Sequence, residues 1–356
     1  MDMLPDRARK GRGAVSNRAG RFEALNHQAI DDGWWQEPEL PPLATTVAPD
    51  ASRSVIARNE SPDIPFDQSV NPYRGCEHGC IYCFARPSHA WLGLSPGLDF
   101  ETRLFAKHDA ARLLRRELAA RGYVCKVISL GANTDPYQPV EGRLRLTRGV
   151  LEVLAETRHP VVVVTKSDRV TADLDLLRTL AEDRLVQVFL SITTLDGALA
   201  RVMEPRAAQP ARRLKAVESL AQAGVPVGVL AAPMIPAIND HELEAILAAA
   251  AAAGAGQAGY TVLRLPLEIA GLFEEWLRTH FPDRAERVLG RMRGLRGGKL
   301  YDSAWGQRMR GSGPEAELLR ARFRAALARY GLNRRDWQLD TTRFRKPGPE
   351  GQLSLL

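Results

Sequence analysis

The sequence predicts an α/β protein built on a parallel sheet, in the form of a partial (β/α)6 TIM-like barrel. Two observations carry this prediction. Strand-like and helix-like segments alternate along most of the chain, and the strand-like segments are short runs of apolar, often β-branched residues. Neighbouring parallel strands need long crossover connections, which helices usually supply. About six such β/α units are present, and a partial barrel fits this count.

The alternation runs from about residue 69 to residue 265. We expect strands over 69–73, 126–130, 161–165, 185–192, 225–231 and 260–265. We expect helices over 109–120, 147–156, 172–182, 211–223 and 242–253. Gly224 follows the fourth of these helices, as is common at helix ends. The run of four valines and a threonine at 161–165 is typical of a buried strand.

The composition changes outside this core, which spans 51–285. The first fifty residues are rich in Arg, Gly, Pro and Ala and show no sustained periodicity, so we expect a mobile basic N-terminal arm over 1–50. A small basic C-terminal extension over 286–345 includes a helix at about 314–328. A tail over 346–356 follows.

Length and composition are those of a globular enzyme, with 356 residues of which 45% are hydrophobic. The apolar runs fall short of the roughly 18 residues that a membrane span needs, and the Met1 end lacks the apolar core of a signal peptide. Four cysteines in a chain of this length do not describe an extracellular disulfide scaffold. We therefore expect a cytoplasmic protein. Its net charge of +7 favours an anionic partner.

Three of the four cysteines lie in one short run, CEHGCIYC, at Cys76, Cys80 and Cys83. Three thiolates can hold a [4Fe–4S] cluster and leave one of its irons open to bind another molecule. The alternative is a Cys3His zinc site with His78 or His89 as the fourth ligand. Structural zinc usually takes its ligands from two separated pairs, and the chain has no second pair, so we favour the cluster.

Polar residues follow the predicted strands, at the edge where parallel sheets bind their ligands. Thr134 and Asp135 follow the second strand, Lys166 follows the third, and Ser191 lies near the end of the fourth. A lysine at a strand end is either a solvent-exposed side chain or an anion ligand. Its place in this pattern favours binding of an anion.

The cysteine run, with Tyr82 before its last cysteine, resembles the signature of the radical S-adenosylmethionine (SAM) superfamily. From about residue 70 to residue 310 the chain resembles the branch that contains spore photoproduct lyase and its uncharacterised relatives. The resemblance implies two cofactors, a [4Fe–4S] cluster and SAM. It also implies that an electron from an external donor cleaves SAM to a 5′-deoxyadenosyl radical, which abstracts a hydrogen atom from the substrate.

The resemblance further implies which residues contact SAM. Lys166 would meet the carboxylate, Thr134 and Asp135 would lie near the amino group, Tyr82 and the segment at Ala232 would lie near the adenine, and Ser191 is a further contact.

The lyase carries a cysteine beside the second strand that returns hydrogen to its product, and the matching position here is Ala132. Cys125 lies earlier on the predicted strand, roughly 20 Å away. The resemblance therefore predicts the cofactors but not the lyase reaction.

Basic residues alternate with aromatic residues and glycines near the end of the resemblance, where the lyase meets DNA. Such a pattern suits nucleic acid, because cations contact phosphates and rings stack on bases. The predicted contacts are Arg293, Arg296, Lys299, Tyr301, Arg308 and Arg310. The alternative is a solvated basic face with two aromatic rings packed beneath it.

The final five residues, QLSLL, resemble the motif with which bacterial DNA-processing proteins dock on the replication sliding clamp. The residues that would dock are Gln352, Leu353, Leu355 and Leu356, the last standing where the motif favours an aromatic residue. The alternative is a tail without a partner.

Three functional hypotheses follow. The leading one is a radical SAM enzyme that acts on a nucleic acid, in repair or modification of DNA. The second is a radical SAM enzyme with a protein or small-molecule substrate. The third is a non-catalytic metal-binding module.

Overall fold

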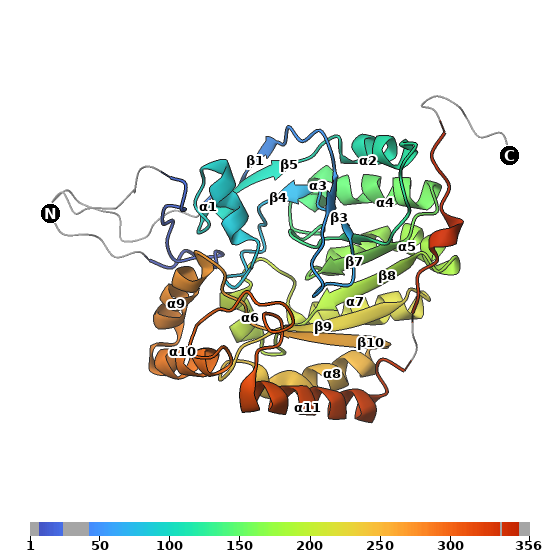
Figure 1. Cartoon of the computed structure of the whole chain (residues 1–356). Coiled ribbons are helices and arrows are strands. Elements are labelled where there is room, and N and C mark those ends of the chain that lie inside the picture. The colour runs from blue at the N-terminus through green and yellow to red at the C-terminus, as the bar shows by residue number, and fades with distance from the viewer. Residues whose placement is uncertain (1–6, 24–42, 335–336, 349–356) are drawn as a thin grey trace.

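A curled, largely parallel sheet forms the centre of the molecule (Figure 1). The computed structural model describes residues 7–23, 43–334 and 337–348. The sheet has the strand order β10-β9-β8-β7-β6-β3-β2. Its strands are β2 (Ile56–Arg58), β3 (Gln68–Val70), β6 (Ile128–Leu130), β7 (Val161–Thr165), β8 (Val186–Ser191), β9 (Val227–Met234) and β10 (Gln257–Val262). Neighbours from β3 to β10 pair in parallel and β2 pairs antiparallel to β3. The predicted partial (β/α)6 barrel is confirmed.

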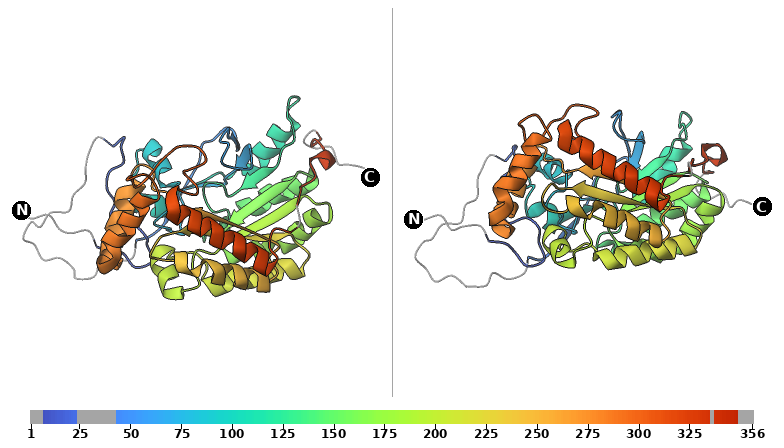
Figure 2. Two further views of the ribbon diagram at one scale, coloured as in Figure 1. Left: turned by 60° about the horizontal axis from the view of Figure 1, so that its bottom comes forward. Right: turned by 90° about the horizontal axis from the view of Figure 1, so that it is seen from below.

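Helices between the strands cover the outer face of this sheet. They are α2 (Ala110–Ala119), α4 (Leu146–Glu156), α5 (Leu174–Glu182), α7 (Pro210–Gln222) and α8 (Leu243–Ala252). The long helix α11 (Gly313–Tyr330) packs over α8 (Figure 2). In α2, Leu114 and Leu118 are buried at i and i+4 while arginines face solvent, which explains why this stretch forms a surface helix. No helix in the described ranges is long and apolar enough to cross a bilayer.

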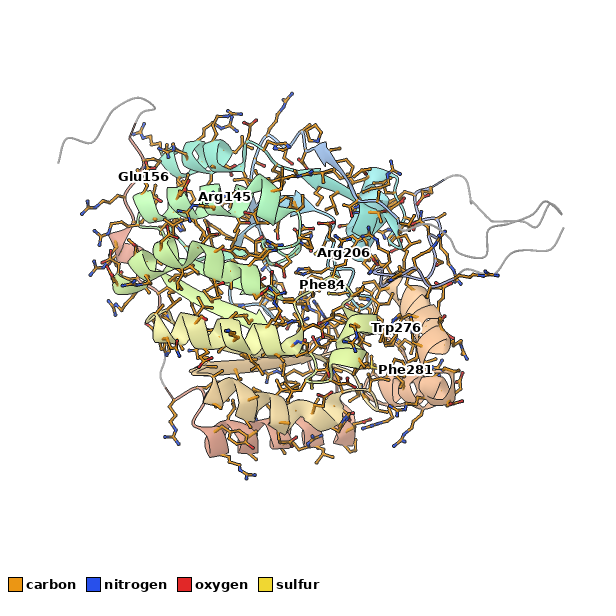
Figure 3. The ribbon with its side chains drawn as sticks, turned by 180° about the vertical axis from the view of Figure 1, so that it is seen from behind. Phe84, Arg145, Glu156, Arg206, Trp276 and Phe281 are labelled. Atoms are coloured by element: carbon orange, nitrogen blue, oxygen red, sulfur yellow. The ribbon has the colours of Figure 1, made fainter. Side chains whose placement is uncertain are left out.

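Several elements were not predicted. A small second sheet joins β1 (Thr46–Pro49), β5 (Arg103–Ala106) and β4 (Tyr73–Arg74). The additional helices are α1 (Asp99–Thr102), α3 (Glu141–Leu144), α6 (Gly197–Met203), α9 (Ile269–His280) and α10 (Ala285–Gly294), with 3-10 turns η1 (Arg86–Leu92), η2 (Asp168–Asp173), η3 (Asp240–Glu242), η4 (Pro282–Arg284) and η5 (Thr341–Arg343). A second apolar cluster under α9 and α10 centres on the fully buried Trp276, whose ring lies 5.5 Å from that of Phe281 (Figure 3).

The strand register brings the predicted site residues to one edge of the sheet. Ile128 pairs with Val161, which pairs with Val186. The carboxyl ends of β6, β7 and β8 therefore lie side by side, and the loops that follow them face the cysteine run. β10 begins three residues before the predicted position, since Gln257 pairs with Gly228 of β9 and a register shift follows Tyr260.

Part of the predicted mobile arm packs against the core, which corrects that prediction. Residues 12–16 are buried, and the backbone N–H groups of Gly13 and Ala14 donate to Glu101 at 2.9 and 2.8 Å. A Cβ atom at Gly13 would lie 1.8 Å from the carbonyl oxygen of Gly79, so this close approach requires glycine. Residues 1–6 and 24–42 of the arm lie outside the described residues. The other predicted domain boundaries stay predictions.

Residues 296–310, here called the strap, link the two edges of the open barrel. At one edge, Val262 of β10 donates its N–H to the Met309 carbonyl at 2.8 Å. At the other edge, between β2 and β3, Asp63 pairs with Arg308 at 2.6 Å and accepts the N–H of Gly306 at 2.7 Å. The strap therefore crosses the side on which the sheet does not close on itself.

Candidate active site

The cysteine loop follows β4 and lies at the carboxyl edge of the sheet. Cys76 and Cys80 are buried and Cys83 is half-buried, and all three thiols are free. The Cys76 N–H donates to the Phe100 carbonyl at 2.9 Å, and the N–H of Ile81 donates to the Met203 carbonyl at 3.1 Å. These bonds join the loop to α1 and α6, so the cysteines are held by the core and not by a mobile surface segment.

A buried ion pair supports this loop from within. Arg86 and Glu101 are both fully buried, and they pair at 2.5 Å. Arg86 also donates to the carbonyl oxygens of Cys80 at 2.9 Å and Gly79 at 3.0 Å. A planar guanidinium donates in several fixed directions, so one side chain fixes the backbone between the first two cysteines.

The chemistry of the loop fits a metal cluster. Burial, followed by the neighbouring Asp135, raises the pKa of the Cys76 thiol, and burial raises that of Cys80 as well. Thiols in such a site become thiolates when a metal supplies positive charge. Three free cysteines on one short loop are the donor set of a [4Fe–4S] cluster that keeps one iron open.

The two histidines of the zinc alternative have other neighbours. His89 is fully buried, its Nε2 lies 3.0 Å from the Arg103 carbonyl oxygen, and its ring packs edge-on against Phe100. His78 Nδ1 lies 3.3 Å from a carboxylate oxygen of Asp135.

Lys166 and Tyr82 lie close together beside the cysteines. Lys166 Nζ lies 5.7 Å from the centre of the Tyr82 ring and interacts electrostatically with Cys80. No carboxylate of the described chain pairs with this amine. A half-buried, unpaired ammonium at a strand end fits an anionic ligand such as the SAM carboxylate.

Asp135 shapes the loop after β7. It accepts hydrogen bonds from the Thr165 hydroxyl and the Lys166 N–H, each at 2.7 Å. Burial raises the pKa of Asp135, but the contact with His78 and these hydrogen bonds outweigh burial and bring it to about 2. The carboxylate is therefore ionised and fixes the backbone that carries Lys166. Its predicted contact with SAM stays a prediction.

The remaining predicted SAM residues lie at the same edge. The Thr134 hydroxyl donates to the Tyr73 carbonyl at 2.9 Å, so its oxygen already has a structural partner. Ser191 is buried at the end of β8, and Ala232 is half-buried within β9. The structure thus brings these residues to the strand ends, and their contact with SAM stays a prediction.

A buried polar network behind Tyr82 was missed by the sequence analysis. The Tyr82 hydroxyl donates to Glu204, which also accepts from the Thr193 hydroxyl at 2.6 Å and pairs with the buried Arg213. Arg213 in turn donates to the Ser191 carbonyl at 2.9 Å. The network therefore links a residue of the cysteine loop to the end of β8. Its partners lie far apart in the sequence, so spacing gives no signal for it.

Two of the predicted nucleic-acid residues have structural roles, which corrects their assignment. Arg296 is buried and donates to the Leu263 carbonyl at 2.7 Å, and Arg308 is paired with Asp63. Their guanidinium groups stabilise the strap and are not free for phosphates. Arg293, Lys299 and Arg310 are exposed, and Tyr301 is half-buried, so contact with nucleic acid stays a prediction for these four.

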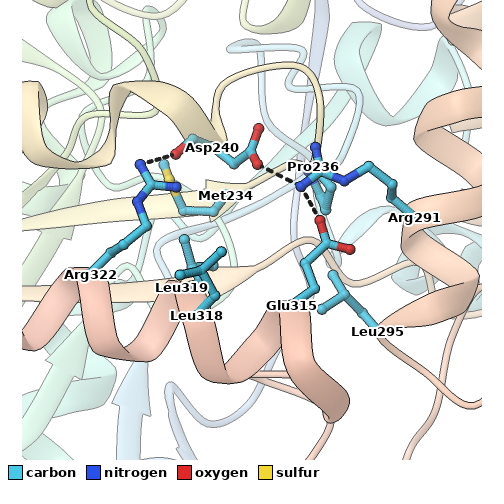
Figure 4. Close-up of a pocket in the computed structure, with 9 residues that line it drawn as sticks. All are labelled: Met234, Pro236, Asp240, Arg291, Leu295, Glu315, Leu318, Leu319 and Arg322. Carbon is cyan, nitrogen blue, oxygen red and sulfur yellow. Dashed lines mark hydrogen bonds and ion pairs between the residues drawn. The ribbon is translucent and has the colours of Figure 1, made fainter.

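Two hollows adjoin the strand ends. One, of about 370 Å³, is polar and lies beside the cysteine loop, between His78, Arg169 and Arg206. Arg206 there pairs with Glu77 at 3.1 Å. The other hollow lies between β9, α10 and α11, where Arg291 pairs with both Asp240 and Glu315 (Figure 4). Its volume of about 30 Å³ is that of a single water molecule, so it is too small for a cofactor.

Cys125 precedes β6 and is half-buried, at the opposite end of this strand from the cysteine loop. The predicted clamp motif, Gln352 to Leu356, lies outside the described residues.

Comparison with known proteins shows the family of the chain. Residues 70–250 match the model of the radical SAM superfamily, and this range contains the cysteine loop and Lys166. An uncharacterised protein of Mycobacterium tuberculosis is 36% identical over 273 residues, which cover 76% of each chain. An uncharacterised protein of Methanocaldococcus jannaschii is 27% identical over 173 residues, covering 49% of this chain and 62% of the other.

Two solved structures share the fold. Spore photoproduct lyase complexed with dinucleoside spore photoproduct has a TM-score of 0.55 at 16% identity, covering 80% of this chain and 78% of the other. A variant of that lyase with bound AdoMet and the same photoproduct has a TM-score of 0.54 at 16% identity, with the same coverage. This chain therefore belongs to the radical SAM superfamily, whose enzymes use a [4Fe–4S] cluster and SAM.

Proposed function

We propose that this radical SAM enzyme acts on a nucleic acid, in repair or modification. The observation that carries the proposal is the strap, which presents an aromatic ring on a fixed support. Trp305 is 58% exposed, and the Arg308 guanidinium lies 4.3 Å from its ring centre. Because Arg308 is itself held by Asp63, the ring is supported from behind and open in front. Such a ring suits a nucleobase, since every base has a face that can stack.

Positive charge on and beside the strap supports the same proposal. Arg293, Lys299 and Arg310 are exposed on or next to the strap, where they suit phosphates. Spore photoproduct lyase, which shares the fold, has been solved with a dinucleoside photoproduct. We infer that this chain also binds a nucleic-acid ligand. We do not infer the lyase reaction, because Ala132 stands where the lyase has its hydrogen-returning cysteine.

Nucleic acid should stimulate reductive cleavage of SAM. One electron and one SAM give methionine and a 5′-deoxyadenosyl radical, which takes a hydrogen atom from the substrate to give 5′-deoxyadenosine and a substrate radical. The test is anaerobic: the reconstituted protein is reduced with dithionite, and 5′-deoxyadenosine is measured with single-stranded DNA, duplex DNA, RNA or no addition. Formation that rises with one of the nucleic acids supports the proposal. Equal formation in all four samples contradicts it and favours a protein or small-molecule substrate.

Trp305→Ala tests whether the exposed ring of the strap binds a base. Loss of one stacked base costs about 1–3 kcal/mol, or roughly 5- to 150-fold in affinity. Trp91→Ala is the matched control, because Trp91 is also exposed and also lies near an arginine, Arg21, but is on η1 and not on the strap. Anisotropy of a labelled oligonucleotide should report weaker binding only for Trp305→Ala. Equal loss in both variants would show that the strap has no special part in binding.

We also propose that the segment QLSLL docks on the bacterial sliding clamp. The support is the sequence pattern alone, in which a glutamine and two leucines match a pocket-binding motif. A double variant, Gln352→Ala with Leu355→Ala, should lose binding to purified clamp, and Ser354→Ala should retain it. Retention of clamp binding by the double variant would refute this assignment.

A further inference from the structure

Arg264 has a half-buried guanidinium with no acceptor. It lies just after β10, two residues beyond the end of the strand. Within the described ranges, no carboxylate or carbonyl oxygen accepts a hydrogen bond from its side chain. Its guanidinium lies 4.5 Å from the centre of the Phe84 ring, which is 43% exposed. Phe84 is labelled in Figure 3.

The other arginines buried around the site are paired. Arg86 has Glu101, Arg213 has Glu204, and Arg296 has the Leu263 carbonyl. A guanidinium that is removed from water without an acceptor costs free energy, so proteins usually provide a partner. An exception of this kind, next to a predicted active site, indicates a partner that binds from outside.

The surroundings of Arg264 favour an anion. Burial lowers the pKa of its guanidinium, and the nearby Arg308 and Arg296 lower it further, while Tyr301 and Cys83 act in the opposite direction. The electrostatic neighbours of the group thus include two cations, Arg308 and Arg296. A phosphate oxygen pair would match the two parallel N–H bonds that arginine donates.

Arg264 also lies close to the cysteine loop. Phe84 directly follows Cys83 in the cysteine loop, and Arg264 interacts electrostatically with both Cys83 and Tyr301 of the strap. Arg264 and Phe84 therefore lie beside the last cysteine of the loop, and Arg264 also lies near the strap.

We propose that Arg264 and Phe84 form an anchoring site for one nucleotide of the substrate: Arg264 binds a phosphodiester group, and the exposed part of the Phe84 ring contacts the adjoining base. This inference rests on the proposed function and deepens it, because it assigns a phosphate contact to a residue outside the basic run. The contact selects a phosphodiester backbone over an uncharged ligand of similar size.

The test compares three variants of the full chain, each reconstituted to the same iron content. Arg264→Gln removes the cation, Phe84→Leu removes the aromatic face, and Arg287→Gln removes an exposed arginine of α10 for which no contact is seen. The dissociation constant of a labelled single-stranded oligonucleotide is measured by anisotropy at several salt concentrations. An acidic peptide of equal charge serves as a second probe.

Arg264→Gln should weaken oligonucleotide binding about tenfold and reduce the slope of log K against log salt by about 0.7, the value for one phosphate of a single strand. Phe84→Leu should weaken binding with an unchanged slope, and Arg287→Gln should match the wild type. The thermal midpoint of Arg264→Gln should not fall, because the variant removes an unpaired charge. A lower midpoint would indicate a structural role and would overturn the inference.

The outcomes separate this inference from the proposed function. If the wild type binds the oligonucleotide and Arg264→Gln shows the same affinity and slope, the anchoring site is refuted while the nucleic-acid proposal stands. If the wild type binds the acidic peptide in preference to the oligonucleotide, the proposed function fails and the anchoring site fails with it.

Discussion

Replacement of Glu101 by alanine should destabilise the cysteine loop more than any exposed ion pair could. Glu101 is fully buried and holds three groups: the guanidinium of Arg86 and the backbone N–H groups of Gly13 and Ala14. The alanine variant leaves all three without this acceptor. Arg86 also holds the backbone of Gly79 and Cys80, so a shift of its side chain displaces the cysteines.

The magnitude follows from burial. Breaking a buried ion pair by removing one partner costs about 3–5 kcal/mol, because a charge is left unpaired. The two N–H groups add about 1 kcal/mol each, at the low end of the usual range, since residues 12–16 can move toward water. The sum, about 5–7 kcal/mol, is comparable to the whole stability of many domains. Glu101→Gln keeps an acceptor oxygen and should cost roughly half as much.

The assay is urea unfolding of the cluster-free protein, followed by circular dichroism, with iron content measured after anaerobic reconstitution. Glu156→Ala is the control, because Glu156 pairs with Arg115 at the surface and such pairs contribute about 0–1 kcal/mol. Glu101→Ala should unfold at much lower urea and hold little iron. Equal urea midpoints and iron contents for Glu101→Ala and Glu156→Ala would refute the reasoning.

Three further predictions concern the cofactors and pH. Cys80→Ala should lose the cluster and form no 5′-deoxyadenosine; an intact EPR signal after reduction would contradict this. Lys166→Ala should keep the cluster and bind SAM about 10- to 100-fold more weakly in anaerobic calorimetry, since a charge-assisted bond contributes about 1.5–3 kcal/mol; unchanged affinity would remove its assigned role. Burial lowers the pKa of His159 to about 4, so the unfolded state takes up the proton first as pH falls below about 6.5. Stability should therefore be fully present above pH 6.5 and decline by about 3 kcal/mol toward pH 4, and His159→Gln should remove that part of the pH dependence in urea titrations.

Local patterns were enough to predict the sheet. The run at 161–165 coincides with β7 because five apolar or β-branched residues in sequence favour a buried strand in almost any context. The cysteine loop and Lys166 were also predictable, because spacing and position after a strand are properties of the local sequence. The approach of Lys166 to Tyr82 depends instead on how the cysteine loop packs against the strand ends, a contact between segments far apart in the sequence.

Long-range contacts account for what the sequence analysis missed. The composition of residues 12–16 suggests mobility, yet Gly13 packs there because its lack of a side chain permits contact with Gly79. Arg296 and Arg308 look like phosphate ligands in a basic run, but their partners, Leu263 and Asp63, lie far away in the sequence. Composition describes the residue types of a segment, whereas the role of each arginine depends on whether the fold brings an acceptor to it.

Removal of the negative charge of Asp63 should weaken nucleic-acid binding, although net charge alone predicts tighter binding. Asp63→Asn keeps an oxygen for the Gly306 N–H but removes the charge that holds Arg308, and with it the support of Trp305. The variant is more positive than the wild type, so if nucleic-acid affinity followed net charge alone it should bind an oligonucleotide more tightly. If Trp305 binds bases from a fixed position, the variant should bind more weakly, because ordering the strap then costs free energy on binding. Tighter binding of a labelled oligonucleotide by Asp63→Asn in anisotropy would show that the strap contributes charge and not a positioned ring.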